Sequence, residues 1–124
     1  MKKYIRVLIN PKNDSSKYLV IFEKRDCNCW NFPGGKVEKN ETIKDACIRE
    51  ISEEISIRIS ELQFLTKKYI KANNTIWEGF YYYAKKYDGD VVLLEDKGLK
   101  YKYIDKKAIK ENDNIFISAV ASFL

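Results

Sequence analysis

Hydrophobic residues fall in short runs along most of the chain, separated by segments of turn-forming residues. The runs with the length and composition typical of strands are residues 4–10, 18–22, 62–71, 76–86 and 100–104. The segment PKNDSS at 11–16 indicates a loop. Asn73 and Asn74 suit a turn between the two longest runs. The pattern therefore predicts a protein built largely from strands.

Residues 42–55 differ from the rest of the chain because their apolar positions follow the period of a helix. Thr42 and Asp45 are three residues apart and resemble a capping box at the start of this helix. The positions predicted to face the core are Cys47, Ile48, Ile51 and Ile55. The interval predicts one central helix between two groups of strands.

The end of the chain, residues 115–124, predicts a closing helix with Asp113 or Asn114 as its cap. Strands on both sides of one central helix, followed by a terminal helix, indicate an α/β sandwich with a mixed sheet. A length of 124 residues is enough for one core, so we expect a single domain covering residues 1–124.

Composition and charge exclude few classes of binding partner. The net charge of +5 favours polyanions, but the lysines are scattered and no nucleic-acid-binding motif is legible, so a nucleic-acid partner is not expected. No apolar run is long enough to span a bilayer, and Arg6 interrupts the first apolar run. Three cysteines without framework spacing fit reduced thiols. We therefore expect a cytoplasmic protein with no membrane partner.

Three carboxylates crowd the second half of the predicted helix, in the stretch REISEE at 49–54. Glu50, Glu53 and Glu54 are spaced i, i+3 and i+4, which brings their side chains together on one helix face. A solvated acidic face is the common role of such glutamates. A divalent cation would instead turn their repulsion into coordination, and oxygen ligands suit Mg²⁺ or Mn²⁺.

The segment before the helix, FPGGK at 32–36, favours the metal-binding interpretation. Its glycines allow a close approach of the backbone, so that Gly35 can offer its carbonyl to a metal. Lys36 follows directly and is placed to meet a phosphate. A metal held by carboxylates beside a lysine is typical of phosphate chemistry.

The spacing of these residues resembles the Nudix box, G-x5-E-x7-R-E-U-x-E-E-x-G-U, in which U is apolar. From Gly35 the chain runs through Glu41 to the stretch REISEEISI, and it matches every fixed position except Ser56, where the pattern has Gly. The preceding WNFPGGKVE is similar to the MutT-like branch of small nucleotide pyrophosphohydrolases. The resemblance implies a Nudix-type α/β/α sandwich with a mixed β-sheet, a catalytic loop–helix–loop and a C-terminal helix.

The resemblance also implies a role for each matching residue. The implied metal ligands, for Mg²⁺ or Mn²⁺, are the Gly35 carbonyl and the side chains of Glu53 and Glu54. Glu50 would be a further ligand or would orient the attacking water. Arg49 would fix a box carboxylate, and Glu41 would brace the loop against the helix. The implied reaction is hydrolysis of a nucleoside diphosphate linked to a further group.

The substrate within this family is less sharply indicated. Branches that cleave ADP-ribose often carry a proline downstream of the box, but the prolines here are Pro11 and Pro33. Branches that cleave dinucleoside polyphosphates often carry a tyrosine there, but positions 73–75 are Asn-Asn-Thr. This favours an NTP, a dNTP or an oxidised form of one, cleaved to the monophosphate and pyrophosphate. An RNA 5′-triphosphate pyrophosphohydrolase and a non-catalytic nucleotide-binding module remain the alternatives.

Further substrate contacts are expected from residues outside the box. Arg25 would hold phosphate or base, unless it is a solvated loop residue, and Asn114 would read a purine edge, unless it caps the last helix. Trp77 is one of several aromatic residues on its strand that could stack on a base. A late carboxylate would come from Glu95, in preference to its neighbour Asp96. Whether the protein is a monomer or a homodimer is left open.

Ser56 is the one departure from the box. The glycine of the pattern is expected to end the helix with a positive φ. Serine there should cost around 1 kcal/mol, because it carries a Cβ. The residue contacts no metal in this interpretation, so activity should survive.

Overall fold

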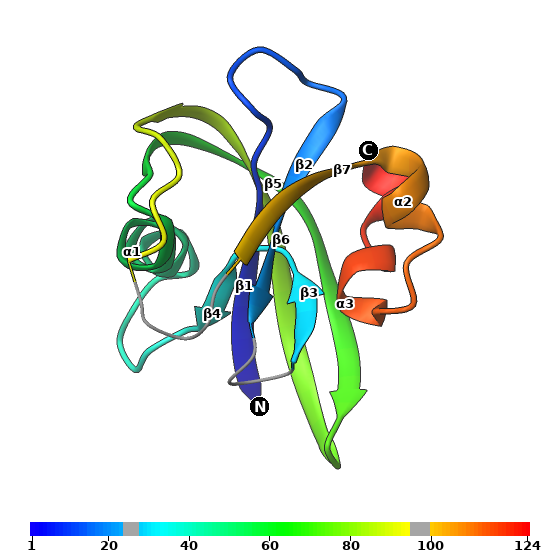
Figure 1. The fold of residues 1–124 in the computed structure, drawn as a ribbon. Coiled ribbons are helices and arrows are strands. Elements are labelled where there is room, and N and C mark those ends of the chain that lie inside the picture. Colours follow the sequence, from blue (N-terminus) through cyan, green and yellow to red (C-terminus); the bar gives the residue numbers. More distant parts are fainter. Residues whose placement is uncertain (24–27, 95–99) are drawn as a thin grey trace.

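The computed structural model describes residues 1–23, 28–94 and 100–124. In chain order its elements are β1 (Lys2–Leu8), β2 (Lys17–Glu23), β3 (Cys29–Asn31), β4 (Gly34–Lys36), α1 (Ile43–Ile55), β5 (Arg58–Ala72), β6 (Thr75–Asp88), β7 (Lys100–Asp105), α2 (Lys106–Lys110), α3 (Ile115–Ser118) and a 3₁₀ helix (Ala121–Phe123). Helix α1 lies on one side of the strands, and α2 and α3 lie on the other (Figure 1). The predicted α/β/α sandwich is confirmed.

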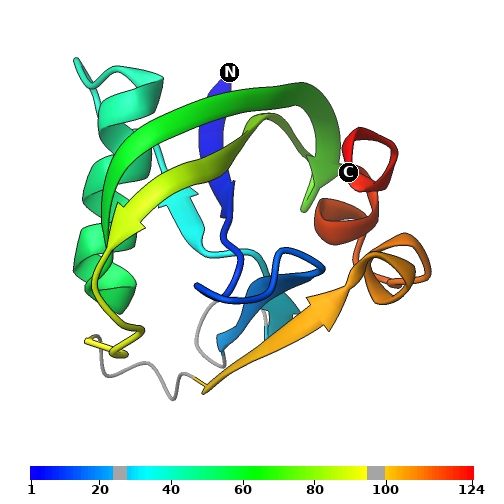
Figure 2. The same cartoon turned by 90° about the horizontal axis from the view of Figure 1, so that it is seen from above.

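The strands form two sheets. The larger has the order β4-β1-β6-β5 and is mixed, because β1 and β6 run parallel while the other neighbours are antiparallel. The smaller has the order β3-β2-β7. Strands β5 and β6 form a long hairpin that curves across the molecule from α1 towards α3 (Figure 2). Its turn uses Asn73 and Asn74, whose φ angles of 52° and 60° suit asparagine.

Two hydrophobic clusters flank the sheets. One packs the buried side chains of α1, among them Cys47 and Ile51, against β1 and β2. The other packs Ile109, Ile117 and Val120 of the C-terminal segment against the opposite face. Apolar burial on both faces fixes the position of α1 and of the strand β4 that precedes it.

Strands β3 and β4 were not predicted from the sequence, since Pro33, Gly34 and Gly35 are poor strand formers. They form because neighbouring strands supply hydrogen-bond partners: β4 pairs with β1, and the Val7 N–H donates to the Pro33 carbonyl at 2.9 Å. Pairing therefore overrides the local preference of the segment.

Three further expectations are corrected. The closing helix predicted at 115–124 is interrupted, and α2 before it was missed, because these short helices depend on packing rather than on long periodic runs. Ile48, predicted to face the core, is 42% exposed. Cys29 is disulfide-bonded rather than a reduced thiol, whereas Cys47 is free and burial raises the pKa of its thiol to about 12.

No helix within residues 1–23, 28–94 and 100–124 is long and apolar enough to cross a membrane.

Candidate active site

The helix that carries the glutamates begins and ends where the box requires. Thr42 caps its start, and the Thr42 hydroxyl oxygen accepts the Asp45 N–H at 3.1 Å. Ser56 caps its end in the left-handed conformation, with φ 61° and ψ 27°, as predicted. The Leu94 N–H donates to the Glu54 carbonyl at 3.1 Å and so occupies one of the carbonyls of the last turn. These contacts fix the rotation and length of α1, and hence the directions of its glutamates.

Gly35 and Glu50 meet where β4 faces the helix. A Cβ placed on Gly35 would lie 2.5 Å from the Glu50 carboxyl carbon and 2.6 Å from each of its oxygens. Real Cβ atoms essentially never approach other atoms so closely. Glycine is therefore needed here so that the backbone can touch the carboxylate.

Glu54 is a buried carboxylate next to the same strand. It is 4% exposed, and its Oε1 accepts a hydrogen bond from the Gly34 N–H at 3.4 Å. Gly34, Gly35, Glu50 and Glu54 all line one cleft with a volume of about 900 Å³. Two carboxylates and a glycine backbone are thus brought to one wall of a cavity large enough for a small molecule.

Arg49 holds this wall together. Its Nε and Nη2 donate to the two carboxylate oxygens of Glu41, at 2.6 and 2.9 Å. Nη2 also donates to the Lys36 carbonyl at 3.2 Å, and Nη1 donates to Glu50 Oε1 at 3.0 Å. The hydrogen bond from Arg49 lowers the pKa of the Glu41 carboxyl, and the same contact raises the pKa of Arg49. A bracing role for Arg49 and Glu41 requires contacts of this kind, and the two roles stay predictions.

Glu53 is placed differently from the other two glutamates. Its side chain is 54% exposed, and its Oε2 accepts a hydrogen bond from Arg49 Nη1 at 3.3 Å. It does not line the cleft. The three carboxylates therefore do not all line one cleft as the helix spacing predicted: Glu50 and Glu54 share the cleft, and Arg49 Nη1 donates to both Glu50 and Glu53.

The donor atoms fit a hard cation, although they do not complete a cage. Within the described residues no group of three or more His, Cys, Asp or Glu side chains is close enough to hold a metal. The cleft instead offers Glu50, Glu54 and the Gly35 backbone on one wall. Mg²⁺ usually binds to a few protein oxygens, and water and phosphate fill its remaining coordination positions.

Aromatic and basic residues also line the cleft. They are Tyr4, Arg6, Phe32, Trp77 and Phe116, which come from different parts of the chain. Arg6 Nη1 donates to the Phe32 carbonyl at 3.2 Å. Its buried Nε has no hydrogen-bond partner among the residues that the structure describes. Arg6 was not predicted to be a site residue, although its charge within an apolar strand could have indicated one.

The predicted substrate contacts have different outcomes. Lys36 and Trp77 both line the cleft. Asn114 lines it too, but Oδ1 accepts the Phe116 N–H at 3.0 Å and Nδ2 donates to the Trp30 carbonyl at 2.9 Å. Its capping role is confirmed. Because these bonds already engage the amide, reading of a base edge by this side chain gains no support.

Arg25, Glu95 and Asp96 lie outside the described residues. The expected phosphate contact of Arg25 and the choice of Glu95 over Asp96 as the late carboxylate stay predictions.

Together, fold and site define an α/β sandwich in which a glycine-rich strand and a capped helix present carboxylates to a cleft of about 900 Å³. The chain belongs to the family of the NUDIX domain, whose model matches residues 3–119. This confirms the resemblance drawn from the box.

Relatives place the chain near the MutT-like members. It is 35% identical over 81 residues to an 8-oxo-dGTP diphosphatase of Buchnera aphidicola subsp. Acyrthosiphon pisum, a match that covers 64% of this chain and 61% of the relative. It is 27% identical over 109 residues to putative nudix hydrolase 1 of Caenorhabditis elegans, covering 86% of this chain and 29% of that protein. The chain thus spans less than two thirds of the length of each of these relatives.

Among solved structures, the fold is similar to that of a MutT NUDIX hydrolase from Burkholderia pseudomallei. The TM-score is 0.86 at 22% identity, and the match covers 99% of this chain and 97% of that one. At this level of identity the similarity establishes the fold.

Proposed function

We propose that this protein hydrolyses a nucleoside diphosphate linked to a further group, with Mg²⁺ or Mn²⁺ as cofactor. The preferred substrate is a (d)NTP or an oxidised (d)NTP, which gives the monophosphate and pyrophosphate. The observation that carries the proposal is the contact between Gly35 and the Glu50 carboxylate in a cleft that Glu54 and Lys36 also line. Activity on such nucleotides agrees with the cytoplasmic location expected from the sequence.

The residues have separate tasks in this reaction. Gly35, Glu50 and Glu54 would hold the metal, which supplies charge neutralisation on the diphosphate and a more acidic bound water. Arg49 keeps Glu50 turned towards the cleft through their 3.0 Å contact. Lys36 and Arg6 place positive charge where phosphate would lie, and the partly exposed Phe116 offers a surface for the base. The oxygen of water would join either the α- or the β-phosphorus as the bond from that phosphorus to their bridging oxygen breaks, and both routes release the monophosphate and pyrophosphate.

A nucleotide panel tests this assignment. The protein is incubated with Mg²⁺ and each of the common and 8-oxo (d)NTPs, and with a 5′-triphosphorylated RNA, and release of pyrophosphate is compared with release of phosphate. We expect pyrophosphate from one or more (d)NTPs. ¹⁸O-labelled water then shows, by the product that carries the label, which phosphorus is attacked.

Two results would contradict the assignment. Release from RNA without release from any nucleotide would support the RNA pyrophosphohydrolase alternative. Binding of nucleotides without hydrolysis, at any Mg²⁺ or Mn²⁺ concentration, would support a non-catalytic module.

A further inference from the structure

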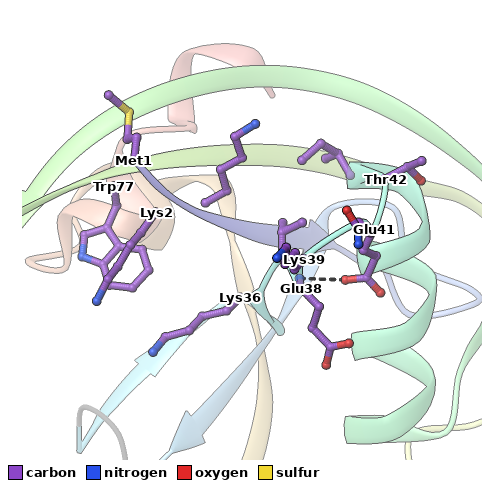
Figure 3. Close-up of a pocket in the computed structure, with 12 residues that line it drawn as sticks. Met1, Lys2, Lys36, Glu38, Lys39, Glu41, Thr42 and Trp77 are labelled. Atoms are coloured by element: carbon purple, nitrogen blue, oxygen red, sulfur yellow. Dashed lines mark hydrogen bonds between the residues drawn. The ribbon is translucent and has the colours of Figure 1, made fainter.

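A second cavity, of about 500 Å³, adjoins the cleft. Lys36 and Trp77 line both cavities, so the two are neighbours across these side chains. Figure 3 shows this second cavity between the start of β1, the loop after β4 and the first turn of α1. Lys36, which the two cavities share, directly follows Gly35 in the chain.

Two ammonium groups lie near the Trp77 ring in this cavity. The Lys2 Nζ lies 5.4 Å from the centroid of the indole ring, and the Lys36 Nζ lies 5.6 Å from it. The sheet register produces this arrangement, because Lys2 is opposite Trp77 and Lys36 is opposite Tyr4, two residues further along β1. Alternation places all three side chains on one face of the sheet.

The charges around the cavity are unbalanced. Its acidic residues, Glu38 and Glu41, both face Arg49, at 3.6 and 2.6 Å. Lys3 is 3.9 Å from Glu78. By contrast, in the described parts of the chain neither Lys2 nor Lys36 has a carboxylate partner within 4.0 Å. Two like charges beside one ring are repulsive unless an anion lies between them.

We propose that Lys2, Lys36 and Trp77 form an anion subsite for the phosphate of the substrate that lies beyond the scissile diphosphate. This inference rests on the proposed function and specifies the distal end of the substrate as a polyphosphate. A phosphate between the two ammonium groups would form charge-assisted hydrogen bonds with both. A base stacked on Trp77 would instead displace the ammonium groups from the ring, so phosphate is the better match.

Binding of inorganic tripolyphosphate tests the subsite without any hydrolysis. Isothermal titration calorimetry at low and at high salt compares the wild type with Lys2→Gln. We expect the variant to bind tripolyphosphate about three- to tenfold more weakly, because one charge-assisted contact is lost. The affinity of the variant should also depend less on salt concentration. Lys2→Arg should retain most of the affinity.

Lys102→Gln is a matched control. Lys102 also lies over an indole, with its Nζ 4.3 Å from the centroid of Trp30, and it lines neither cavity. This variant removes the same charge and the same kind of ring contact, so it should bind tripolyphosphate as the wild type does. Equal losses in Lys2→Gln and Lys102→Gln would overturn the proposal, because net charge alone would then explain the binding. No loss in either variant would overturn it as well.

Kinetics separates this inference from the proposed function. If nucleotides are hydrolysed, Lys2→Gln should raise KM for a nucleoside triphosphate about three- to tenfold and leave KM for the matching diphosphate unchanged. An equal change for both substrates would overturn the subsite while the hydrolase assignment stands. If no nucleotide is hydrolysed, the proposed function fails, and the tripolyphosphate titration alone decides the subsite.

Discussion

The contact between Gly35 and Glu50 shows how one missing side chain creates the site. The three atoms nearest to a Cβ on Gly35 would all belong to the carboxylate end of Glu50, which is the tip of a flexible side chain. A Cβ on Gly34 would instead lie 2.0 Å from the backbone oxygen of Ile5. The two adjacent glycines therefore serve different purposes: Gly34 allows the strand to pair, and Gly35 allows the carboxylate to approach.

Gly35→Ala should abolish most of the activity and leave the fold nearly intact. The new methyl group would push the Glu50 carboxylate away from the cleft, and a displaced catalytic group costs about 100-fold or more in turnover. Thermal unfolding should change by less than about 1 kcal/mol, because only a side-chain end must move. Gly34→Ala is the contrasting variant and should lower stability strongly. Wild-type turnover in Gly35→Ala would show that the position of Glu50 is irrelevant to the reaction.

Ser56→Gly should stabilise the protein slightly. Serine at φ 61° pays a steric penalty that glycine avoids. The greater freedom of glycine in the unfolded chain offsets part of the gain, which leaves a few tenths to about 1 kcal/mol. Chemical denaturation should report this gain, with turnover unchanged. A loss of stability would mean that the Ser56 hydroxyl makes a contact worth more than the penalty.

At the scale of elements, the loop before α1 and the helix itself are joined by a single guanidinium. Arg49 reaches Glu41 in the loop, the Lys36 carbonyl at the end of β4, and Glu50 on its own helix. Sequence spacing could predict that Arg49 and Glu41 belong to one motif. It could not predict β4, because its residues form a strand only through their pairing with β1.

Arg49→Lys tests the geometry of this junction at constant charge. An ammonium group cannot reproduce the planar pair of bonds to Glu41 and also reach Glu50. We expect turnover to fall about tenfold or more, with KM less affected than kcat, since Glu50 would lose its orientation. Lys44→Arg, an exposed change on the same helix, is the control and should be neutral. Equal kcat in wild type and Arg49→Lys would show that charge alone suffices.

The same junction should contribute to stability in a pH-dependent way. The Arg49 contact lowers the pKa of Glu41 below its ordinary value of 4.5. A lowered carboxyl pKa adds stability above the ordinary value, and this stability is lost as pH falls through the folded-state pKa. Glu41→Gln should therefore be less stable than the wild type at pH 7, and the difference in Tm should shrink below about pH 4. A difference that is constant from pH 7 to pH 3 would exclude this linkage.

At the scale of the whole molecule, the cleft is formed by segments that meet only in the folded chain. Tyr4 and Arg6 come from β1, Phe32 precedes β4, and Phe116 belongs to α3. A ligand that contacts all of these segments can bind only the native state. It should therefore stabilise the protein against unfolding.

Mg²⁺ should raise Tm, and a bound nucleotide should raise it further. At a metal concentration about 100-fold above Kd the gain is about 2.7 kcal/mol. The shift should vanish in Glu50→Gln/Glu54→Gln, which removes both carboxylates of the cleft. Glu61→Gln/Glu111→Gln removes two carboxylates elsewhere and should keep the full shift. Equal metal-induced shifts in the two double variants would place the cation outside the cleft.

The sequence by itself determined the motif and the main elements: the box from Gly35 to Ile57, the capped helix, the long hairpin and the sandwich class. These are local properties, because spacing, caps and turn residues act within a few positions of the chain. The tertiary structure decided which carboxylates share the cleft, since burial of Glu54 and exposure of Glu53 follow from how α1 packs on the sheets. It also decided that Arg6 and Trp77 line the cleft and that Lys2 lies beside Trp77, because these contacts depend on strand order and register. Apart from the consecutive pairs β2–β3 and β5–β6, neighbours across these sheets come from distant parts of the chain, and the pattern along one strand does not identify the strand beside it.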